Sequence, residues 1–266
     1  MNLTFDDYLA WHAENLGEDL NSAELASIYN VNARNLLGVV STGDFLKDFE
    51  EGLRVLEDAG DLADGQSNKI KFQAKSLSSV INKIYRLNCH WNRKWPHEPR
   101  AGWVKLKTCF SQMDDIVRAT VVSKLLDGVQ SVVDAAVLIG EEREDVCIKA
   151  SPRATESGHY AWHIYVTTRE DVLIDGAAQE IDFRTEVQVI TQLQSVLKGL
   201  THPFYERSRV NEQRPTAERR WQFDEPGFRG EFLGHTLHLV DAMILELKKE
   251  AEDAAALEAH QAEEDN

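Results

Sequence analysis

The chain has 266 residues, 42% of them hydrophobic, and a formal net charge of -16 at pH 7. This length allows a full buried core, either in one large domain or in a catalytic domain with helical extensions. The acidic N-terminus has no signal-peptide pattern and no apolar run approaches a membrane span, so we expect a cytoplasmic protein without membrane contact. Three widely spaced cysteines argue against a disulfide framework.

Charge is unevenly distributed along the sequence. Residues 1–66 contain fourteen Asp and Glu against three Lys and Arg, whereas residues 69–107 contain ten Lys and Arg against one acid. Six further Arg lie between 207 and 229. A basic middle in an acidic chain indicates a phosphate-binding region, because the local field guides an anion to its site. Pairing of these bases with the acidic ends is an equally good explanation.

The N-terminal third has the pattern of helices. Thr4 can cap a first helix, a second spans roughly 22–40, and a third starts at 41–44 and ends at Gly60. These helices contain no group of residues that indicates a catalytic site. The polar, glycine-containing loop that follows is the expected boundary, so we predict an N-terminal helical region over 1–66.

A strand, a turn and a helix N-terminus are expected next. Residues 70–75 alternate like a strand, and Ser78 or Ser79 can cap the helix behind it. Helix N-termini and nearby lysines attract phosphates, so Lys75, Ser79 and Lys83 are candidate triphosphate contacts. The alternative is that these lysines are only solvated.

The middle of the chain interleaves strands with helices. The expected strands cover 113–122, 145–150, 160–168 and 179–190, with a helix over 127–140, another from Thr191 and a long C-terminal helix. This alternation favours an α/β or α+β sheet domain.

One strand carries a carboxylate within an apolar run. Period-two alternation puts Val187 and Val189 on one face and Glu186, Gln188 and Ile190 on the other. A buried carboxylate is costly unless it has a partner such as a metal or a cation. The helix that follows has an apolar stripe at helical spacing, formed by Leu193, Val196, Leu197 and Leu200.

Four segments in chain order resemble the synthetase domain of the RelA/SpoT family of alarmone-making nucleotidyltransferases, over approximately 69–209. The family motif Arg-x-Lys-x-x-x-Ser-x-x-x-Lys is matched by Gln73 to Lys83 except at its first Arg. The Asp that enters a buried strand is matched by Asp115. Gly-Tyr-x-x-x-His is matched by Gly158 to His163, and Glu-x-Gln-x-Arg-Thr by Glu186 to Thr191, each with one substitution.

The departures from the family pattern concern aromatic and basic positions. Gln73 and Ile190 replace Arg, and His159 stands where the family Tyr stacks on the acceptor base. Thr120 stands where the family has an Arg five residues after the Asp, with Arg118 nearby. The pattern is most similar to the small, often toxic members. The adjacent His-Asp pair of the family's hydrolase half is absent from this sequence, so the resemblance implies synthesis without hydrolysis.

The resemblance implies an α+β fold with a mixed central β-sheet flanked by helices. It places the nucleotidyltransferase domain at 67–229 and a C-terminal helix with an acidic tail at 230–266. The implied reaction transfers pyrophosphate from ATP to a ribose 3′-hydroxyl of GDP or GTP, with Mg²⁺ as cofactor.

The resemblance also assigns roles to individual residues. The implied catalytic residues are Asp115, Glu186 and Gln188, of which Asp115 and Glu186 bind Mg²⁺. The implied ATP contacts are Lys75, Ser79, Lys83 and Arg118, and the implied acceptor contacts are His159, Tyr160 and His163. The alternatives are a buried ion pair for Glu186, a cap or a pair with Arg118 for Asp115, and ordinary packing for the aromatic and histidine residues.

Two other functions stay open at this stage. The 3′ CCA end of tRNA is a second possible acceptor, which the toxic branch and the basic segments favour, and an antitoxin protein would then be a partner. A degenerate domain that only binds nucleotide or a protein partner is the third. Retention of Asp115, Glu186, Lys75 and Lys83 speaks against that third function.

Overall fold

The N-terminal region is helical, as the sequence predicts. The computed structural model describes residues 4–66, 70–209 and 226–264. The first helices are α1 (Phe5–Leu16), α2 (Ala23–Thr42) and α3 (Asp44–Asp58). Thr4 closes a capping box on α1, and the Ser22 side chain accepts a hydrogen bond from an amide in the first turn of α2. Both side chains satisfy amide groups that a helix start leaves unpaired.

The central sheet is mixed and has five strands in the order β1-β2-β5-β4-β3. The strands are β1 (Gln73–Ala74), β2 (Val117–Ser123), β3 (Cys147–Ala154), β4 (Tyr160–Ile174) and β5 (Ala177–Thr191). β2 and β5 are parallel, and the other neighbours are antiparallel. The predicted α+β class is therefore confirmed. The strand expected over 70–75 is wrong in extent, since only two of its residues pair with β2.

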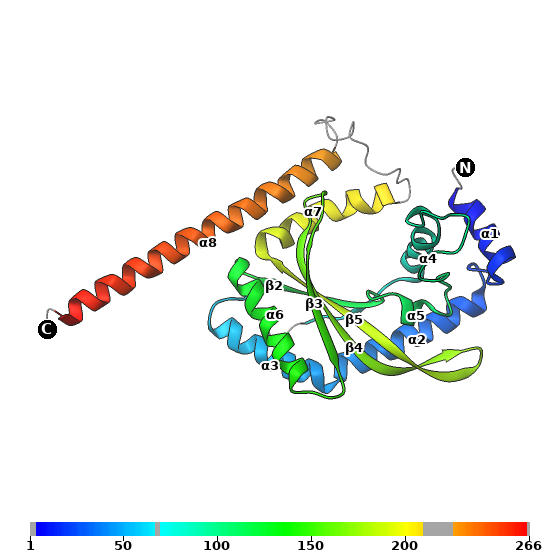
Figure 1. Ribbon diagram of the computed structural model, residues 1–266, viewed down its shortest axis with the longest axis horizontal. Helices are drawn as coiled ribbons and strands as arrows, with labels where there is room; N and C mark the ends of the chain where they lie inside the picture. Colours follow the sequence, from blue (N-terminus) through cyan, green and yellow to red (C-terminus); the bar gives the residue numbers. More distant parts are fainter. Residues whose placement is uncertain (1–3, 67–69, 210–225, 265–266) are drawn as a thin grey trace.

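Helices connect and flank the strands (Figure 1). They are α4 (Leu77–Tyr85), a π-helical turn η1 (Arg86–His90), α5 (Cys109–Gln112), α6 (Leu126–Glu141), α7 (Gln192–Arg209) and α8 (Pro226–Glu264). α8 packs beside α7 and then projects away from the rest of the molecule, and it starts before the predicted position 230. No helix in the described ranges is both long and apolar enough to cross a bilayer.

The two faces of the sheet differ in polarity. One face is apolar and is covered by α3 and α6, as the strand alternation dictates. The core there is formed by Phe49, Leu53, Val121, Val132, Val133, Ile164, Val187 and Val189. Complete burial of a side chain of this size stabilises the fold by about 1.5–3 kcal/mol. The opposite face carries polar residues on β2, β4 and β5, and all the clustered site residues lie on or beside it.

The N-terminal helices hold the segment between α4 and β2. The Trp11 ring lies 4.5 Å from that of Trp95 and 5.1 Å from that of Trp103, centroid to centroid. Just after α1, the buried carboxylate of Glu18 accepts hydrogen bonds from the amides of Leu106 and Lys107. These tryptophans pack against one another, so this region supports the site without forming it.

Candidate active site

The register of β2, β5 and β4 gathers polar side chains on one face of the sheet. Glu186 lies opposite Arg118 on β2 and opposite Tyr165 on β4. Two residues further along β5, Gln188 lies opposite Thr120 and His163. Because side chains alternate between faces, all six point away from the α6 side. The predicted shared face of Glu186 and Gln188 is confirmed.

Asp115 joins the two candidate phosphate-binding lysines. Lys75 Nζ lies 2.5 Å from Asp115 Oδ2, and Lys83 Nζ lies 2.6 Å from Asp115 Oδ1. The three side chains are only 9–19% exposed. Burial alone would raise the pKa of Asp115, but the charges of Lys83 and Lys75 hold it far below its usual range. The alternative pairing of Asp115 with Arg118 is wrong, since among the described residues Asp115 forms ion pairs with Lys75 and Lys83 and none with Arg118.

The backbone around Lys75 is fixed from two sides. Its amide donates to the Ile116 carbonyl at 2.7 Å, and its own carbonyl accepts from the Tyr29 hydroxyl at 2.6 Å. The next residue, Ser76, caps α4 by accepting from the Ser79 amide at 3.3 Å. The predicted cap at Ser78 or Ser79 is therefore wrong by two or three residues, because the helix begins one residue after Ser76. Ser79 lies in the first turn of α4, as its proposed role requires.

Glu186 is a buried carboxylate with two side-chain partners, Gln188 and His163. The Gln188 amide donates to its Oε1 at 2.6 Å, and His163 Nδ1 lies 3.0 Å from its Oε2. Burial raises the pKa of Glu186, but these two contacts outweigh burial and bring the pKa below its ordinary value. Glu186 is therefore ionised at neutral pH. The alternative of a buried ion pair stays open, because His163 lies at ion-pair distance, whereas no Lys or Arg among the described residues does.

Asp115 and Glu186 both carry carboxylate oxygens, the ligands that Mg²⁺ prefers in proteins. The negative charge of Asp115 opposes the ionisation of Glu186. No cluster of three or more His, Cys, Asp or Glu ligands occurs in the part of the chain that the structure describes. Mg²⁺ often takes one or two protein carboxylates and completes its shell with water and substrate phosphates, so the chemistry of these two side chains suits this ion.

His159 and Tyr160 lie on opposite faces of the sheet. His159 ends the loop formed by residues 155–159, hereafter the acceptor loop, and lines a cavity of about 310 Å³ beside Gln188. Tyr160 lies stacked on His238 of α8, with ring centroids 3.8 Å apart, and its hydroxyl hydrogen-bonds His235. The two residues are adjacent, so strand alternation separates them. Of the two predicted base platforms, the geometry favours His159.

Lys198 of α7 enters the same cavity and was not singled out from the sequence. It lines the cavity with Arg118 and Gln188. The predicted apolar stripe of α7 is wrong at two positions, since Val196 and Leu200 are 59% and 64% exposed. The helix instead turns a mixed face towards the sheet, formed by Gln194, Leu197, Lys198 and Thr201. The i, i+3, i+4, i+7 spacing of those four residues was the signal available in the sequence.

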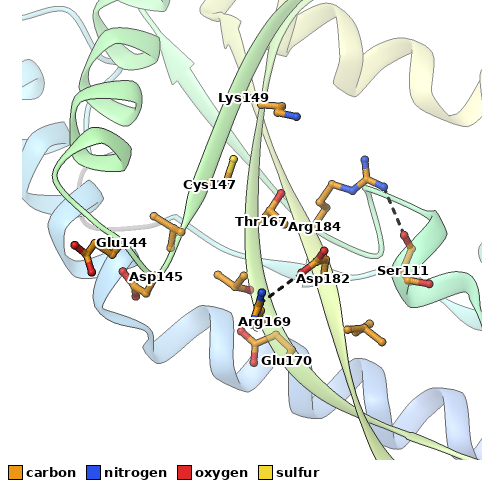
Figure 2. A pocket seen from close by; sticks show the side chains of 13 residues that line it. Ser111, Glu144, Asp145, Cys147, Lys149, Thr167, Arg169, Glu170, Asp182 and Arg184 are labelled. Carbon is orange, nitrogen blue, oxygen red and sulfur yellow. Dashed lines mark hydrogen bonds and ion pairs between the residues drawn. The ribbon is translucent and has the colours of Figure 1, made fainter.

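A second, open groove of about 1060 Å³ extends over the same face of the sheet (Figure 2). Its charged side chains are largely paired: Arg184 bonds the Ser111 carbonyl and lies 3.0 Å from Asp114, and Arg169 lies 4.0 Å from Asp182. Acids and bases are mixed here. The groove therefore does not form a continuous basic path for a nucleic acid.

The comparison with solved structures identifies the fold as that of the small alarmone synthetases. The Bacillus subtilis small alarmone synthetase 1 bound to its product pppGpp matches with a TM-score of 0.50 and 16% identity, over 85% of this chain and 94% of that one. A GTP pyrophosphokinase family protein from Streptococcus pneumoniae matches with a TM-score of 0.53 and 17% identity, over 88% of this chain and 96% of that one. No protein-family model and no curated protein matches the sequence.

Proposed function

We propose that this protein transfers pyrophosphate from ATP to the ribose 3′-hydroxyl of GDP or GTP, and so makes a guanosine alarmone. The observation that supports this most is the pairing of Asp115 with Lys75 and Lys83 just before β2, next to the Glu186–Gln188 pair on the neighbouring strand β5, in a fold shared with small alarmone synthetases. One neighbour with this fold is bound to pppGpp. The absence of a His-Asp pair from the sequence supports synthesis without hydrolysis.

In the proposed reaction, the 3′-oxygen forms a bond to the β-phosphorus of ATP. The bond from that phosphorus to the bridging α,β-oxygen breaks, and AMP leaves with the electron pair. The proton of the 3′-hydroxyl passes to the carboxylate of Glu186, which is ionised and held by Gln188 and His163. Transfer of this kind depends mostly on positioning and on neutralising charge.

Lys75 and Lys83 are the proposed ligands of the ATP phosphates. Both ammonium groups bond Asp115, so phosphate oxygens compete with this carboxylate for the same donors. Ser79, in the first turn of α4, adds a hydroxyl beside a helix N-terminus. The lysines are therefore preorganised, and their release from Asp115 frees the carboxylate oxygens.

Asp115 and Glu186 are the proposed metal ligands. Mg²⁺ bound there would neutralise charge on the polyphosphate of ATP. On the acceptor side, His159 is the proposed stacking partner of the base, and His163 orients Glu186. Arg118, a proposed contact of ATP, lines the same cavity as His159.

The test uses Mg²⁺ and γ-labelled ATP with GDP, GTP, ATP or deacylated tRNA as acceptor. Label on a guanosine nucleotide supports the proposal, and label on tRNA alone replaces it with the translation-blocking activity of a toxin. Asp115→Ala and Glu186→Ala should each lower the rate by about 100- to 10,000-fold, the usual contribution of a general base or metal ligand. A wild-type protein that labels nothing contradicts the proposal, and so do variants that label as fast as wild type.

A further inference from the structure

Lys198 places an ammonium group beside Gln188 in the cavity that both residues line. Its Nζ donates to Gln188 Oε1 at 2.9 Å and to Thr120 Oγ1 at 3.3 Å. These two acceptors are directly opposite each other on the parallel strands β5 and β2. The lysine therefore crosses from α7 to the polar face of the sheet, next to the residue that bonds Glu186.

This ammonium group lies beside a second cation. Within the described ranges, neither Lys198 nor Arg118 has a carboxylate at ion-pair distance, whereas Lys75 and Lys83 share one. Burial, followed by the positive charge of Arg118, lowers the pKa of Lys198. The charge of Glu186 acts in the opposite direction. Two partly buried cations that repel each other are stabilised when an anion binds between them.

Lys198 lies next to Thr120, a residue at which the sequence departs from the family it resembles. Thr120 stands where that family has an Arg, and Lys198 contacts the Thr120 hydroxyl. Ile190, at another of the three substituted Arg positions, is 2% exposed and offers no polar group. A positive charge from α7 thus lies within hydrogen-bond distance of Thr120, the side chain that stands at one of these Arg positions.

The surrounding cavity accommodates part of a nucleotide. It holds about 310 Å³ and is lined by Arg118, Gln188 and Lys198 on one side and by Ser157, Gly158 and His159 of the acceptor loop on the other. We infer that Lys198, together with Arg118, binds a phosphate group of a substrate nucleotide and supplies the charge that Thr120 lacks. This inference rests on the proposed function for the identity of the nucleotides.

A purely structural role predicts different behaviour. In that case Lys198 would only tie α7 to the sheet through its two hydrogen bonds. Lys198→Gln retains a donor and removes the charge, whereas Lys198→Met removes both. Adding Thr120→Arg to Lys198→Met returns a cation to the site from β2 instead of α7. These three variants therefore separate charge from tethering.

The experiment measures binding by calorimetry with Mg²⁺ and either GTP or α,β-methylene ATP. Lys198→Met and Lys198→Gln should both bind one of these nucleotides about 10- to 100-fold more weakly, the usual effect of losing a charge-assisted contact. Thr120→Arg in the Lys198→Met background should recover much of the loss. The control Lys47→Met removes an exposed lysine on α3 and should leave both affinities unchanged. The nucleotide that is affected identifies which phosphate Lys198 contacts.

Three outcomes overturn the inference. In the first, Lys198→Met and Lys198→Gln both bind each nucleotide within twofold of wild type. In the second, only Lys198→Met loses affinity, and in the third, wild type binds neither nucleotide. Thermal melting of each variant separates loss of fold from loss of binding. Transfer assays on wild type keep the two hypotheses distinguishable. If wild type transfers no pyrophosphate but the variants lose affinity, the proposed function fails and the phosphate contact stands. If wild type transfers pyrophosphate and the variants bind as it does, only the role of Lys198 fails.

Discussion

Gly158 of the acceptor loop and Gly234 of α8 approach so closely that neither position has room for a side chain. A Cβ atom on Gly234 would lie 2.2 Å from the carbonyl oxygen of Gly158, and one on Gly158 would lie 2.3 Å from that of Glu231. Gly158 also has a φ of +75°, which other residues rarely adopt. The stack of Tyr160 on His238 lies beside this contact, so α8 holds the loop that the proposed acceptor must meet.

Gly234→Ala should loosen α8 from the acceptor loop. The new methyl group clashes with backbone that cannot rotate away, so we expect a loss of about 1–3 kcal/mol in the free energy of unfolding. Chemical denaturation measures this change. The control is Gly38→Ala in α2, where nothing lies within 4 Å of the new methyl group, and which should be neutral or slightly stabilising. Equal stability of both variants would show that α8 does not pack as described.

His159→Ala and Tyr160→Phe should affect the acceptor differently. Base stacking on an aromatic ring contributes about 1–3 kcal/mol, so His159→Ala should raise the KM for the guanine nucleotide about 10- to 100-fold. Tyr160→Phe keeps the ring against His238 and loses only the hydrogen bond to His235, so its KM should change little. Steady-state kinetics with the acceptor varied measure both. A larger KM effect for Tyr160→Phe would reverse the assignment.

Local periodicity predicted most of the fold but not how its elements meet. The alternation around Glu186 correctly placed Glu186 and Gln188 on one face, because strand geometry fixes faces without knowledge of neighbours. The strand predicted over 160–168 starts at Tyr160, as β4 does, yet the sequence did not show that Tyr160 packs on α8 while His159 lines the cavity. Asp115 was predicted to be important, yet its lysine partners depend on pairing of segments 32 and 40 residues away.

Lys198 illustrates the other limit of sequence reasoning. Leucine and valine on α7 suggested which side faces the core, but Val196 and Leu200 are exposed and the polar Gln194 is buried. A helix beside a polar cleft turns polar residues inward, so apolar periodicity misidentifies its buried face. The contact of Lys198 with Thr120 spans 78 residues of sequence and needs the assembled sheet.

Asp241 should make stability depend on pH. It is fully buried, its Oδ2 accepts from the Thr191 hydroxyl at 2.5 Å, and its Oδ1 has no partner among the described residues. Burial raises its pKa above the ordinary value, with His238 as the nearby titrating group. Because this pKa is raised, the contribution of Asp241 to the free energy of unfolding is complete below about pH 4. It is lost as the pH rises through the folded-state pKa.

The side chain introduced by Asp241→Asn cannot ionise, so the variant should not lose this stability as the pH rises. The free energy of unfolding of the variant, relative to wild type, should therefore increase between pH 4 and pH 7. Urea denaturation at both pH values measures the difference. Since His238 also titrates in this range, His238→Gln paired with Asp241→Asn isolates the carboxylate. A difference that stays constant with pH would contradict burial of an ionised Asp241.

Asp115 should make stability depend on pH in the direction opposite to that of Asp241. Its pKa is lowered because Lys83 and Lys75 outweigh burial, so its contribution is complete above about pH 4 and declines as the pH falls through the folded-state pKa. Asp115→Asn leaves two largely buried ammonium groups without their carboxylate, which costs about 3–5 kcal/mol for a buried pair. Urea denaturation should show this loss at pH 7 and a smaller one at pH 2–3, because this range lies below the ordinary pKa of an Asp in the unfolded chain.

The adjacent Asp114 provides the matched control for Asp115→Asn. Asp114 pairs with Arg184, and their side chains are 37% and 42% exposed, so water screens the pair. Asp114→Asn should therefore cost no more than about 1 kcal/mol at pH 7. Adding Lys75→Met to Asp115→Asn removes one of the stranded ammonium groups and should restore part of the stability, because the cost arises from an uncompensated buried charge. Additive losses in that double variant would mean that Lys75 and Asp115 do not form the buried pair.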